Sequence, residues 1–216
     1  IVTYFFLHMN FMHILWNMLF LYWFGKIIHE NIGNNALISL YIIGGIIGGL
    51  SYMALFNIIP YYDNRVSESL MLGASAGVFS VVVGSATLLP NYTFYLLFLG
   101  PVRIKYIALF YVLLSFFDVT GSNAGGEIAH LGGALMGYLY IRQLQNGVNM
   151  GKGIIDILNI FNKNKKEVIS KEEEKNEINK DISQDEIDKI LDKISDSGYK
   201  SLSNNEKEKL FNASKK

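Results

Sequence analysis

A serine, two histidines and an asparagine lie inside apolar stretches of the chain, where polar side chains are costly. Ser75 and His130 are flanked by small or apolar residues, while His13 and Asn17 are four residues apart on one expected helix. Polar groups at such positions usually face a protein interior or a water-filled cavity and mark function. A serine hydroxyl becomes a useful nucleophile only with a base in reach, and a neutral imidazole can take its proton and return it to a leaving amine. We therefore expect Ser75 to be a nucleophile and His130 its base.

The tetrahedral intermediate of such a reaction carries an oxyanion, which needs hydrogen-bond donors. Asn17 can donate from its amide, His13 from a ring N–H, and Ser75 from its backbone N–H at the start of a helix. Glu127, three residues before His130, is the acidic residue in a position to orient it, and it is expected nearer the water. The residues therefore favour a dyad of Ser75 and His130 over a triad.

The chain that must position these residues has two unlike parts. Its 216 residues are 50% hydrophobic and balance 19 basic against 19 acidic residues. Residues 1–150 contain only five of each sign, whereas the last 66 residues contain 14 of each. Such an apolar front cannot cover itself with a water-compatible surface, so it predicts a bundle of membrane helices. The absence of cysteine excludes disulfides and thiolate ligands, and the lack of a basic stretch interleaved with aromatic residues argues against nucleic acid as a partner.

The front contains five apolar segments that can span a bilayer, each of which needs about 20 mostly apolar residues. They cover roughly residues 6–24, 36–59, 70–89, 104–119 and 128–144. The apolar stretch 94–100 is broken off by Pro101, so it is expected at the interface and not across the membrane.

The cations between these segments predict their orientation. Most fall in the first and third connections and after the last segment: Lys26, Arg103, Lys105 and Arg142. Cytoplasmic loops carry an excess of cations, so these connections and the tail are expected in the cytoplasm. The first, third and fifth segments then start at the outer face, which brings the four polar residues to one depth.

Two glycines on the last segment predict close contact between helices. Gly133 and Gly137 follow His130 at three and seven residues, on the same face, in a G-x-x-x-G pattern. Such a face lets helix backbones approach closely, as His130 must do in order to reach Ser75.

We divide the chain into a membrane core at 1–145, a cytoplasmic linker at 146–184 and a small helical hairpin at 185–216. Ser203 and Glu206 have the spacing of a capping box at the start of the second hairpin helix. The hairpin is too small to be stable without a partner surface, and the sequence does not reveal that partner.

Three motifs, HILWN at 13–17, GASAG at 73–77 and AHLGG at 129–133, lie in this order on alternate segments. In this arrangement the chain resembles the rhomboid family of intramembrane serine proteases, from residue 1 to about 145. The resemblance implies an all-α, polytopic membrane helix bundle in which five of the family's six core helices are present. The family's first helix and most of the loop after it are then expected to be missing from this sequence.

The resemblance also implies roles for single residues. Ser75 and His130 correspond to the family's catalytic dyad, and His13 and Asn17 to its oxyanion side. An aromatic residue four places after the nucleophile stacks on the catalytic histidine in the family, and this position is Phe79. The supporting residues are Gly73, Phe79, Gly133 and Gly137.

The implied activity is that of an intramembrane serine endopeptidase that cleaves transmembrane proteins and needs no cofactor or metal. Its substrates must reach the dyad laterally from the lipid bilayer. The resemblance points to entry between the first and fourth of the five segments, where we expect Trp16 and Phe116 to form a gate. The expected location is a bacterial inner membrane, with the active site opening to the outer side and the tail in the cytoplasm.

Two other interpretations stay open. A non-proteolytic rhomboid-like protein would bind transmembrane clients, although such members typically lack the serine or the histidine. A metal site or ion pathway would use His8, His13 and His130, but it would have no carboxylate at the same depth.

Overall fold

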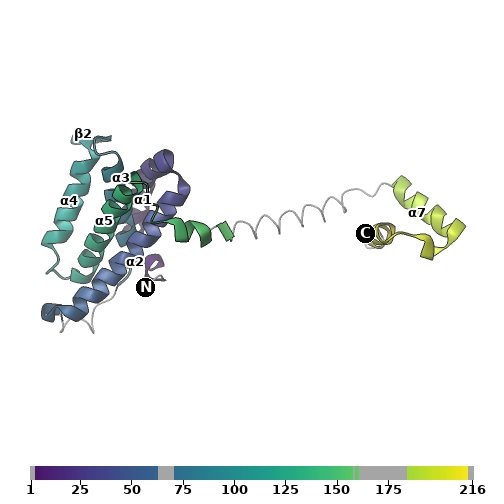
Figure 1. Cartoon of the computed structure of the whole chain (residues 1–216), viewed down its shortest axis with the longest axis horizontal. Helices are drawn as coiled ribbons and strands as arrows, with labels where there is room; N and C mark the ends of the chain where they lie inside the picture. Colours follow the sequence, from purple (N-terminus) through teal and green to yellow (C-terminus); the bar gives the residue numbers. More distant parts are fainter. Residues whose placement is uncertain (1–2, 63–70, 158, 161–183, 214–216) are drawn as a thin grey trace. The chain divides into compact units, whose positions relative to one another are not determined.

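The computed structural model describes residues 3–62, 71–157, 159–160 and 184–213. The chain divides into two compact units, Ile1–Asp156 and Ile157–Lys216. The first unit is a bundle of helices, which Figure 1 shows in colours from purple to green. Its helices are α1 (Phe11–Ile32), α2 (Asn34–Ile58), α3 (Ser75–Leu88), α4 (Ile104–Phe117) and α5 (Ala124–Gln145), preceded by a 3-10 turn at Thr3–Phe6. The predicted all-α bundle with five core helices is confirmed.

Two helices begin later than their hydropathy predicts, and local chemistry explains both starts. α1 begins at Phe11 and not near residue 6, because the Asn10 side chain accepts a hydrogen bond from the His13 backbone N–H at 2.9 Å and caps the helix. α3 begins at Ser75 and not near residue 70, because Gly73 has a φ of +118°, a conformation that interrupts a helix. Residues 63–70 lie outside the described part of the chain.

The helices differ in length, which matters for how deep their ends lie. α1 and α2 are long and apolar enough to cross a membrane, by length and composition. α3 and α4 are apolar but have only 14 residues each. A helix of that size is about 21 Å long, whereas the hydrocarbon core of a bilayer is about 30 Å thick. If such a helix reaches one membrane surface, its other end lies below the opposite surface.

α3 packs against α1, α2, α4 and α5, and its contact with α5 depends on two glycines. A Cβ added to Gly133 would meet the carbonyl oxygen of Ala76, and one added to Gly137 would meet that of Ser80. α2 approaches α3 in the same way, because Gly44 faces the side chain of Ser80. The close helix contact predicted from the G-x-x-x-G pattern on α5 is therefore confirmed.

The large, fully buried apolar side chains of the bundle lie toward the end remote from Ser75. They come from the C-terminal parts of α1 and α5, the N-terminal parts of α2 and α4, and the middle of α3. They are Ile28, Leu40, Val81, Ile104, Tyr140 and Ile141. This core fixes the five helices to one another at one end, so that side chains at the other end can line a cavity.

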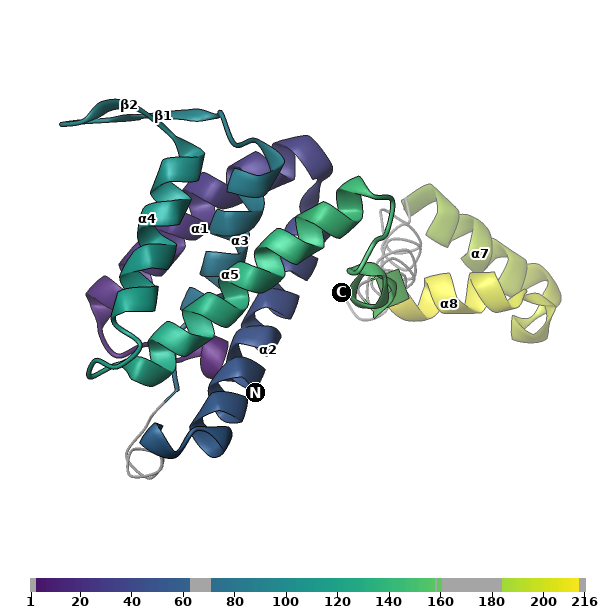
Figure 2. The same ribbon diagram turned by 60° about the vertical axis from the view of Figure 1, so that its left-hand side comes forward.

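α3 and α4 are joined by an antiparallel β-hairpin that the sequence pattern does not predict. β1 (Thr93–Leu96) pairs with β2 (Gly100–Arg103), with Phe94 opposite Val102. The sequence predicts only an apolar interfacial stretch here. Figure 2 shows the hairpin projecting sideways beyond α4 at one end of the bundle.

The second unit contains α7 (Gln184–Ser197), a 3-10 turn at Tyr199–Ser201 and α8 (Asn204–Ala213). The predicted capping box is present: the Ser203 backbone N–H donates to the Glu206 carboxylate at 2.7 Å, and the Glu206 N–H donates to the Ser203 hydroxyl at 3.3 Å. Lys193 on α7 donates to the same carboxylate at 2.8 Å. Together, the Lys193 ammonium and the Ser203 N–H lower the pKa of Glu206 to about 2. Most of the predicted linker falls on residues 161–183, outside the described part of the chain.

We expect Gly137→Val to destabilise the first unit, because the added side chain would collide with the Ser80 backbone and push α5 away from α3. Overpacking of this kind costs about 1–3 kcal/mol. Thermal unfolding in detergent measures the effect, with Gly153→Val as the matched control, because a Cβ at Gly153 meets nothing within 4 Å. An unchanged melting temperature for Gly137→Val would show that the bundle does not depend on this contact.

Candidate active site

Ser75 and His130 lie in direct contact although 55 residues separate them in sequence. Ser75 is the first residue of α3, and His130 lies two turns into α5. The Nε2 atom of His130 is 2.7 Å from the Oγ atom of Ser75. The close contact between α3 and α5 explains this short distance. Gly133, one turn after His130 on α5, lies against the backbone of Ala76, the residue that follows Ser75 on α3. This distance permits direct proton transfer from the serine hydroxyl to the imidazole.

The other ring nitrogen of His130 faces a carboxylate. Its Nδ1 atom lies 3.1 Å from Oε2 of Glu127 and 3.3 Å from the Ser115 hydroxyl of α4. The side chains of Glu127 and His130 are each only 15% exposed. Asn123 donates to the remaining carboxylate oxygen of Glu127 at 3.4 Å. Glu127 is expected nearer the water than His130, but its side chain is equally buried, because residues three apart share one helix face and α4 covers this face.

An aromatic ring fixes the plane of the imidazole. Phe79 on α3 stacks on His130 with ring centroids 4.3 Å apart and an angle of 6° between the planes. This is the position at which the sequence resemblance implies a stacking aromatic residue. Stacking on one face and hydrogen bonds at both nitrogens leave the ring little freedom to rotate.

The two polar residues of α1 lie beside the serine. Asn17 is buried, and its side-chain N–H donates to the His13 carbonyl oxygen one turn earlier at 2.9 Å. The amide group of Asn17 has a second N–H that this bond does not use. The His13 ring lies against Gly73, close enough that a Cβ there would be 2.8 Å from its Cε1 atom. Gly73 therefore makes room for His13 next to Ser75.

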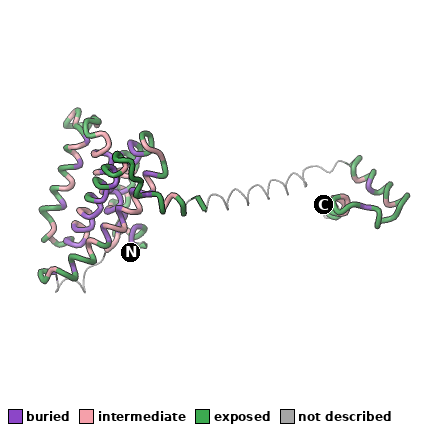
Figure 3. Tube along the Cα trace, in the orientation of Figure 1, coloured by how far each residue is buried: buried purple, intermediate pink, exposed green. Residues whose placement is uncertain are grey.

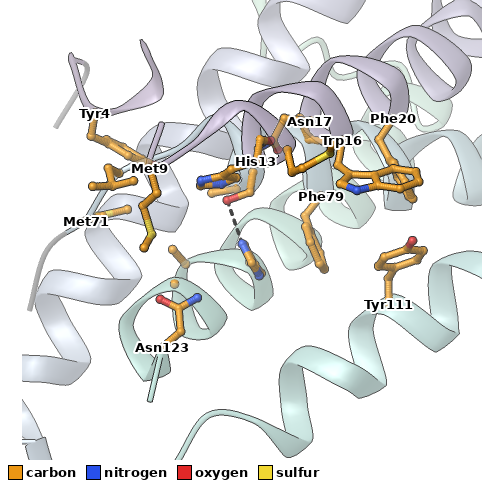
Figure 4. A pocket seen from close by; sticks show the side chains of 18 of the residues that line it. Tyr4, Met9, His13, Trp16, Asn17, Phe20, Met71, Phe79, Tyr111 and Asn123 are labelled. Carbon is orange, nitrogen blue, oxygen red and sulfur yellow. Dashed lines mark hydrogen bonds between the residues drawn. The ribbon is translucent and has the colours of Figure 1, made fainter. Parts of the chain in front are cut away.

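A cavity of about 590 Å³ contains all four polar residues. His13 and Asn17 on α1, Ser75 on α3 and His130 on α5 line its polar part. Its apolar part is lined by aromatic and aliphatic side chains, of which Figure 4 labels Trp16 and Phe20 on α1, Phe79 on α3 and Tyr111 on α4. The arrangement combines a serine, a base and several N–H donors in one pocket whose walls are apolar.

The expected gate residues are only partly placed at this cavity. Trp16 lines it and is half exposed, whereas Phe116 does not line it and has its ring beside Phe117, 5.7 Å away. The ring contact between α1 and α4 is instead made by Phe20 and Tyr111, whose centroids are 4.8 Å apart. Phe20 could have been found from the sequence, because it lies seven residues after His13 on the same face of α1.

The structure gives little support to a histidine-based metal site. The His8 and His13 rings pack edge to face at 5.1 Å, and both nitrogens of His130 already contact Ser75 or Glu127. In the described ranges, no group of three or more His, Cys, Asp or Glu side chains is arranged to hold a metal ion.

Comparisons with known proteins divide the chain into an N-terminal and a C-terminal part, and the boundary lies close to the change from apolar to charged composition. A family model described as the Rhomboid domain matches residues 1–146, and one described as a family of unknown function (DUF6576) matches residues 170–216. The chain is 29% identical over 157 residues to "RHOMBOID-like protein 12, mitochondrial" from Arabidopsis thaliana. This alignment covers 68% of the chain and 46% of the relative, so the chain spans about half the relative's length. No solved structure matches significantly.

The Rhomboid domain model covers more than half of the chain and includes all five helices of the first unit together with Ser75 and His130. The apolar helices of that unit agree with the membrane location that this family implies. The chain belongs to the rhomboid family of membrane proteins.

Proposed function

We propose that this protein is an intramembrane serine endopeptidase, a hydrolase that cleaves transmembrane proteins within or beside their membrane-spanning helix. The observation that carries the proposal is the 2.7 Å contact between Ser75 and His130 inside a cavity formed by apolar helices. Membership of the rhomboid family supports it, because rhomboid proteases use a serine and a histidine in these motifs.

Proteolysis at this site begins with the attack of Ser75. Its Oγ atom bonds to the carbonyl carbon of the scissile peptide while His130 Nε2 takes the hydroxyl proton. The C–N bond then breaks, His130 gives the proton to the leaving amine, and an acyl ester remains on Ser75. A water molecule then gives a proton to His130 and its oxygen bonds to the acyl carbon. The ester C–O bond breaks, His130 returns the proton to the Oγ atom of Ser75, and the new carboxyl end is released.

Three N–H groups are available for the oxyanion that forms in both steps. They are the second side-chain N–H of Asn17, a ring N–H of His13 and the backbone N–H of Ser75. The backbone N–H of Ser75 is in the first turn of α3, where N–H groups have no acceptor within the helix. Donors fixed in an apolar cavity stabilise developing charge more strongly than they would in water.

Glu127 acts in this scheme as a positioning residue for His130. Its carboxylate accepts a hydrogen bond from Nδ1–H, which leaves Nε2 free to accept the serine proton. The negative charge also stabilises the imidazolium that forms during the attack. Asn123 and Ser115 hold the carboxylate and the ring in place. The proposed unit is therefore a serine, a histidine and a glutamate, and not the dyad that the sequence favours.

Transmembrane substrates enter, in this proposal, between α1 and α4. The contact between these helices near the cavity is the pair of rings from Phe20 and Tyr111, and Tyr111 also meets Phe79, the ring that stacks on His130. Separation of the two rings would open the apolar part of the cavity to the lipid. A substrate helix must unwind to reach Ser75, so small, helix-breaking residues near the cleaved bond are favoured.

We propose a multi-pass arrangement in a bacterial inner membrane, with the cavity opening to the outer side and the tail in the cytoplasm. The basic residues Lys26, Arg103, Lys105 and Arg142 support this orientation, because all lie at the helix ends remote from Ser75.

We expect Ser75→Ala and His130→Ala each to reduce cleavage of a transmembrane substrate to below about a thousandth of the wild-type rate, and the double variant to be no worse than either single one. Each substitution removes half of one nucleophilic unit. The assay uses purified protein in vesicles, with folding checked by thermal unfolding. Normal cleavage by a folded Ser75→Ala variant would rule out the mechanism. Substrate binding without cleavage by the wild type would favour the non-proteolytic alternative.

Replacement of Glu127 by Gln should lower kcat about tenfold to a thousandfold while KM and the melting temperature stay unchanged. Glutamine keeps the shape and an acceptor oxygen but removes the charge that stabilises the imidazolium. The matched control is Glu30→Gln, because Glu30 is an exposed carboxylate that pairs with Lys26 at 3.7 Å. An unchanged kcat, or a loss that merely follows a lower melting temperature, would show that Glu127 does not position His130 for catalysis.

Phe20→Ala should increase cleavage of a transmembrane substrate by about two- to fivefold, because it removes the ring contact that closes the gap between α1 and α4. Cleavage of a short water-soluble peptide should not increase, since such a peptide does not enter from the lipid. Phe116→Ala is the control, because Phe116 is exposed on α4 and does not line the cavity. An equal increase for both kinds of substrate would argue against lateral entry at Phe20.

A further inference from the structure

The β-hairpin between α3 and α4 is firmly attached at its base. The Ile104 backbone N–H donates to the Tyr92 carbonyl oxygen at 2.8 Å, across the two ends of the hairpin. The Phe94 ring lies 5.2 Å from the ring of Phe24 on α1. β2 continues into α4 without a linker, since Arg103 is followed by the first helical residue. The direction in which the hairpin projects is therefore set by the bundle.

The tip of the hairpin exposes large apolar side chains. Tyr95, Leu97, Phe98 and Leu99 are 84%, 89%, 92% and 74% exposed. Two-stranded hairpins are marginally stable in water, and a cluster of exposed apolar side chains marks an interaction surface. We define the tip as residues 95–99 and expect its side chains to contact an apolar surface.

The apolar surface of the tip continues along α4. Helix α4 exposes Tyr106, Leu109, Phe110, Leu113 and Leu114 on its outer side. Figure 3 shows most residues of α4 as exposed or intermediate, and Figure 2 shows the hairpin lying across the end of α4 and extending past it. In a membrane protein the outer face of an apolar helix contacts lipid. A hairpin that runs across the end of such a helix lies at the level where the hydrocarbon region meets the headgroups.

The base of the hairpin carries positive charge, and among the described residues neither Arg103 nor Lys105 forms a salt bridge. Arg103 at the end of β2 is exposed, and the Lys105 ammonium lies 5.2 Å from the centre of the Tyr106 ring. The sequence from 71 to 117 contains no Asp or Glu. An apolar tip beside cations is the pattern of segments that insert into an interface and bind anionic headgroups.

We propose that residues 93–105 form an interfacial anchor: the tip inserts among the acyl chains and headgroups of the adjacent leaflet, and Arg103 and Lys105 bind anionic phospholipid headgroups. This surface lies at the end of the bundle remote from Ser75, so the proposal does not depend on proteolytic activity. A protein partner or a second copy of the chain would cover the same apolar residues, but it would give no reason for two cations next to them that form no salt bridge in the described part of the chain.

Quenching of a single tryptophan tests the proposal. The chain contains two tryptophans, Trp16 and Trp23, which are first replaced by Phe. F98W then reports on the tip, and F110W in the same background reports on the lipid-facing side of α4. Full-length protein is reconstituted into phosphatidylcholine vesicles that contain a small fraction of brominated phosphatidylcholine or brominated phosphatidylglycerol, and iodide is used as the aqueous quencher.

We expect both reporters to be quenched by brominated phosphatidylcholine and protected from iodide. For F98W the brominated phosphatidylglycerol should quench about twofold more strongly, and the added substitutions R103Q and K105Q should remove this preference. Quenching of F98W by iodide but not by lipid would place the tip in water, and protection from both would show that protein covers it. Either result, or a preference for the anionic lipid that survives R103Q and K105Q, would overturn the proposal, provided that F110W shows normal insertion.

Discussion

The close approach of α3 and α5 is the contact on which the rest of the first unit depends. Gly133 faces the carbonyl oxygen of Ala76, so the two backbones touch one residue after Ser75 and one turn beyond His130. The same contact therefore fixes both the packing of the helices and the 2.7 Å distance between the serine and the histidine. A side chain larger than hydrogen at Gly133 would push α3 away from α5 and would therefore also separate Ser75 from His130. Helix packing without large side chains is a common solution in membranes, where apolar side chains gain little by leaving the lipid.

The bundle divides its tasks along the helix axes. At one end Ile28, Leu40 and Ile104 form a closed apolar core. At the other end the same helices enclose a cavity in which polar side chains find partners in one another: His130 contacts Ser75, Glu127 and Ser115. Polar groups are costly in an apolar bundle unless they are paired or reach water, so their concentration at the start of the short helix α3 supports a catalytic interpretation. The closed core fixes the positions of the helices. Because of this, α4 does not need to pack closely against the other helices near the cavity.

Much of this arrangement could be predicted from the sequence, and each failure has a physical reason. Long apolar runs predict the helices, but the start of α1 depends on the Asn10 cap and the start of α3 on Gly73, neither of which hydropathy detects. The motifs predict that Ser75 and His130 meet. The burial of Glu127 does not follow from its place in the chain; it depends on the helix face that Glu127 shares with His130 and that α4 covers.

Long-range side-chain contacts were the hardest features to predict. The contact between Phe20 and Tyr111 depends on how α1 and α4 are rotated, and apolar helices exposed to lipid have no polar face that reports this rotation. For this reason Phe116 could not be told apart from the residues that line the cavity. The sequence does not predict the β-hairpin, because its strands have only four residues each and lack the regular alternation of apolar and polar residues that usually marks a strand.

If His130 activates Ser75 as a nucleophile, Ser75 should react with reagents that label activated serines covalently. The protein in detergent is treated with a fluorophosphonate, which reacts with activated serines, and the modified peptide is identified by mass spectrometry. We expect a single adduct on Ser75 in the wild type and none in His130→Ala, although the chain contains other serines, including the neighbouring Ser115. Absence of an adduct on Ser75 in the folded wild type, or equal labelling in His130→Ala, would show that His130 does not activate Ser75.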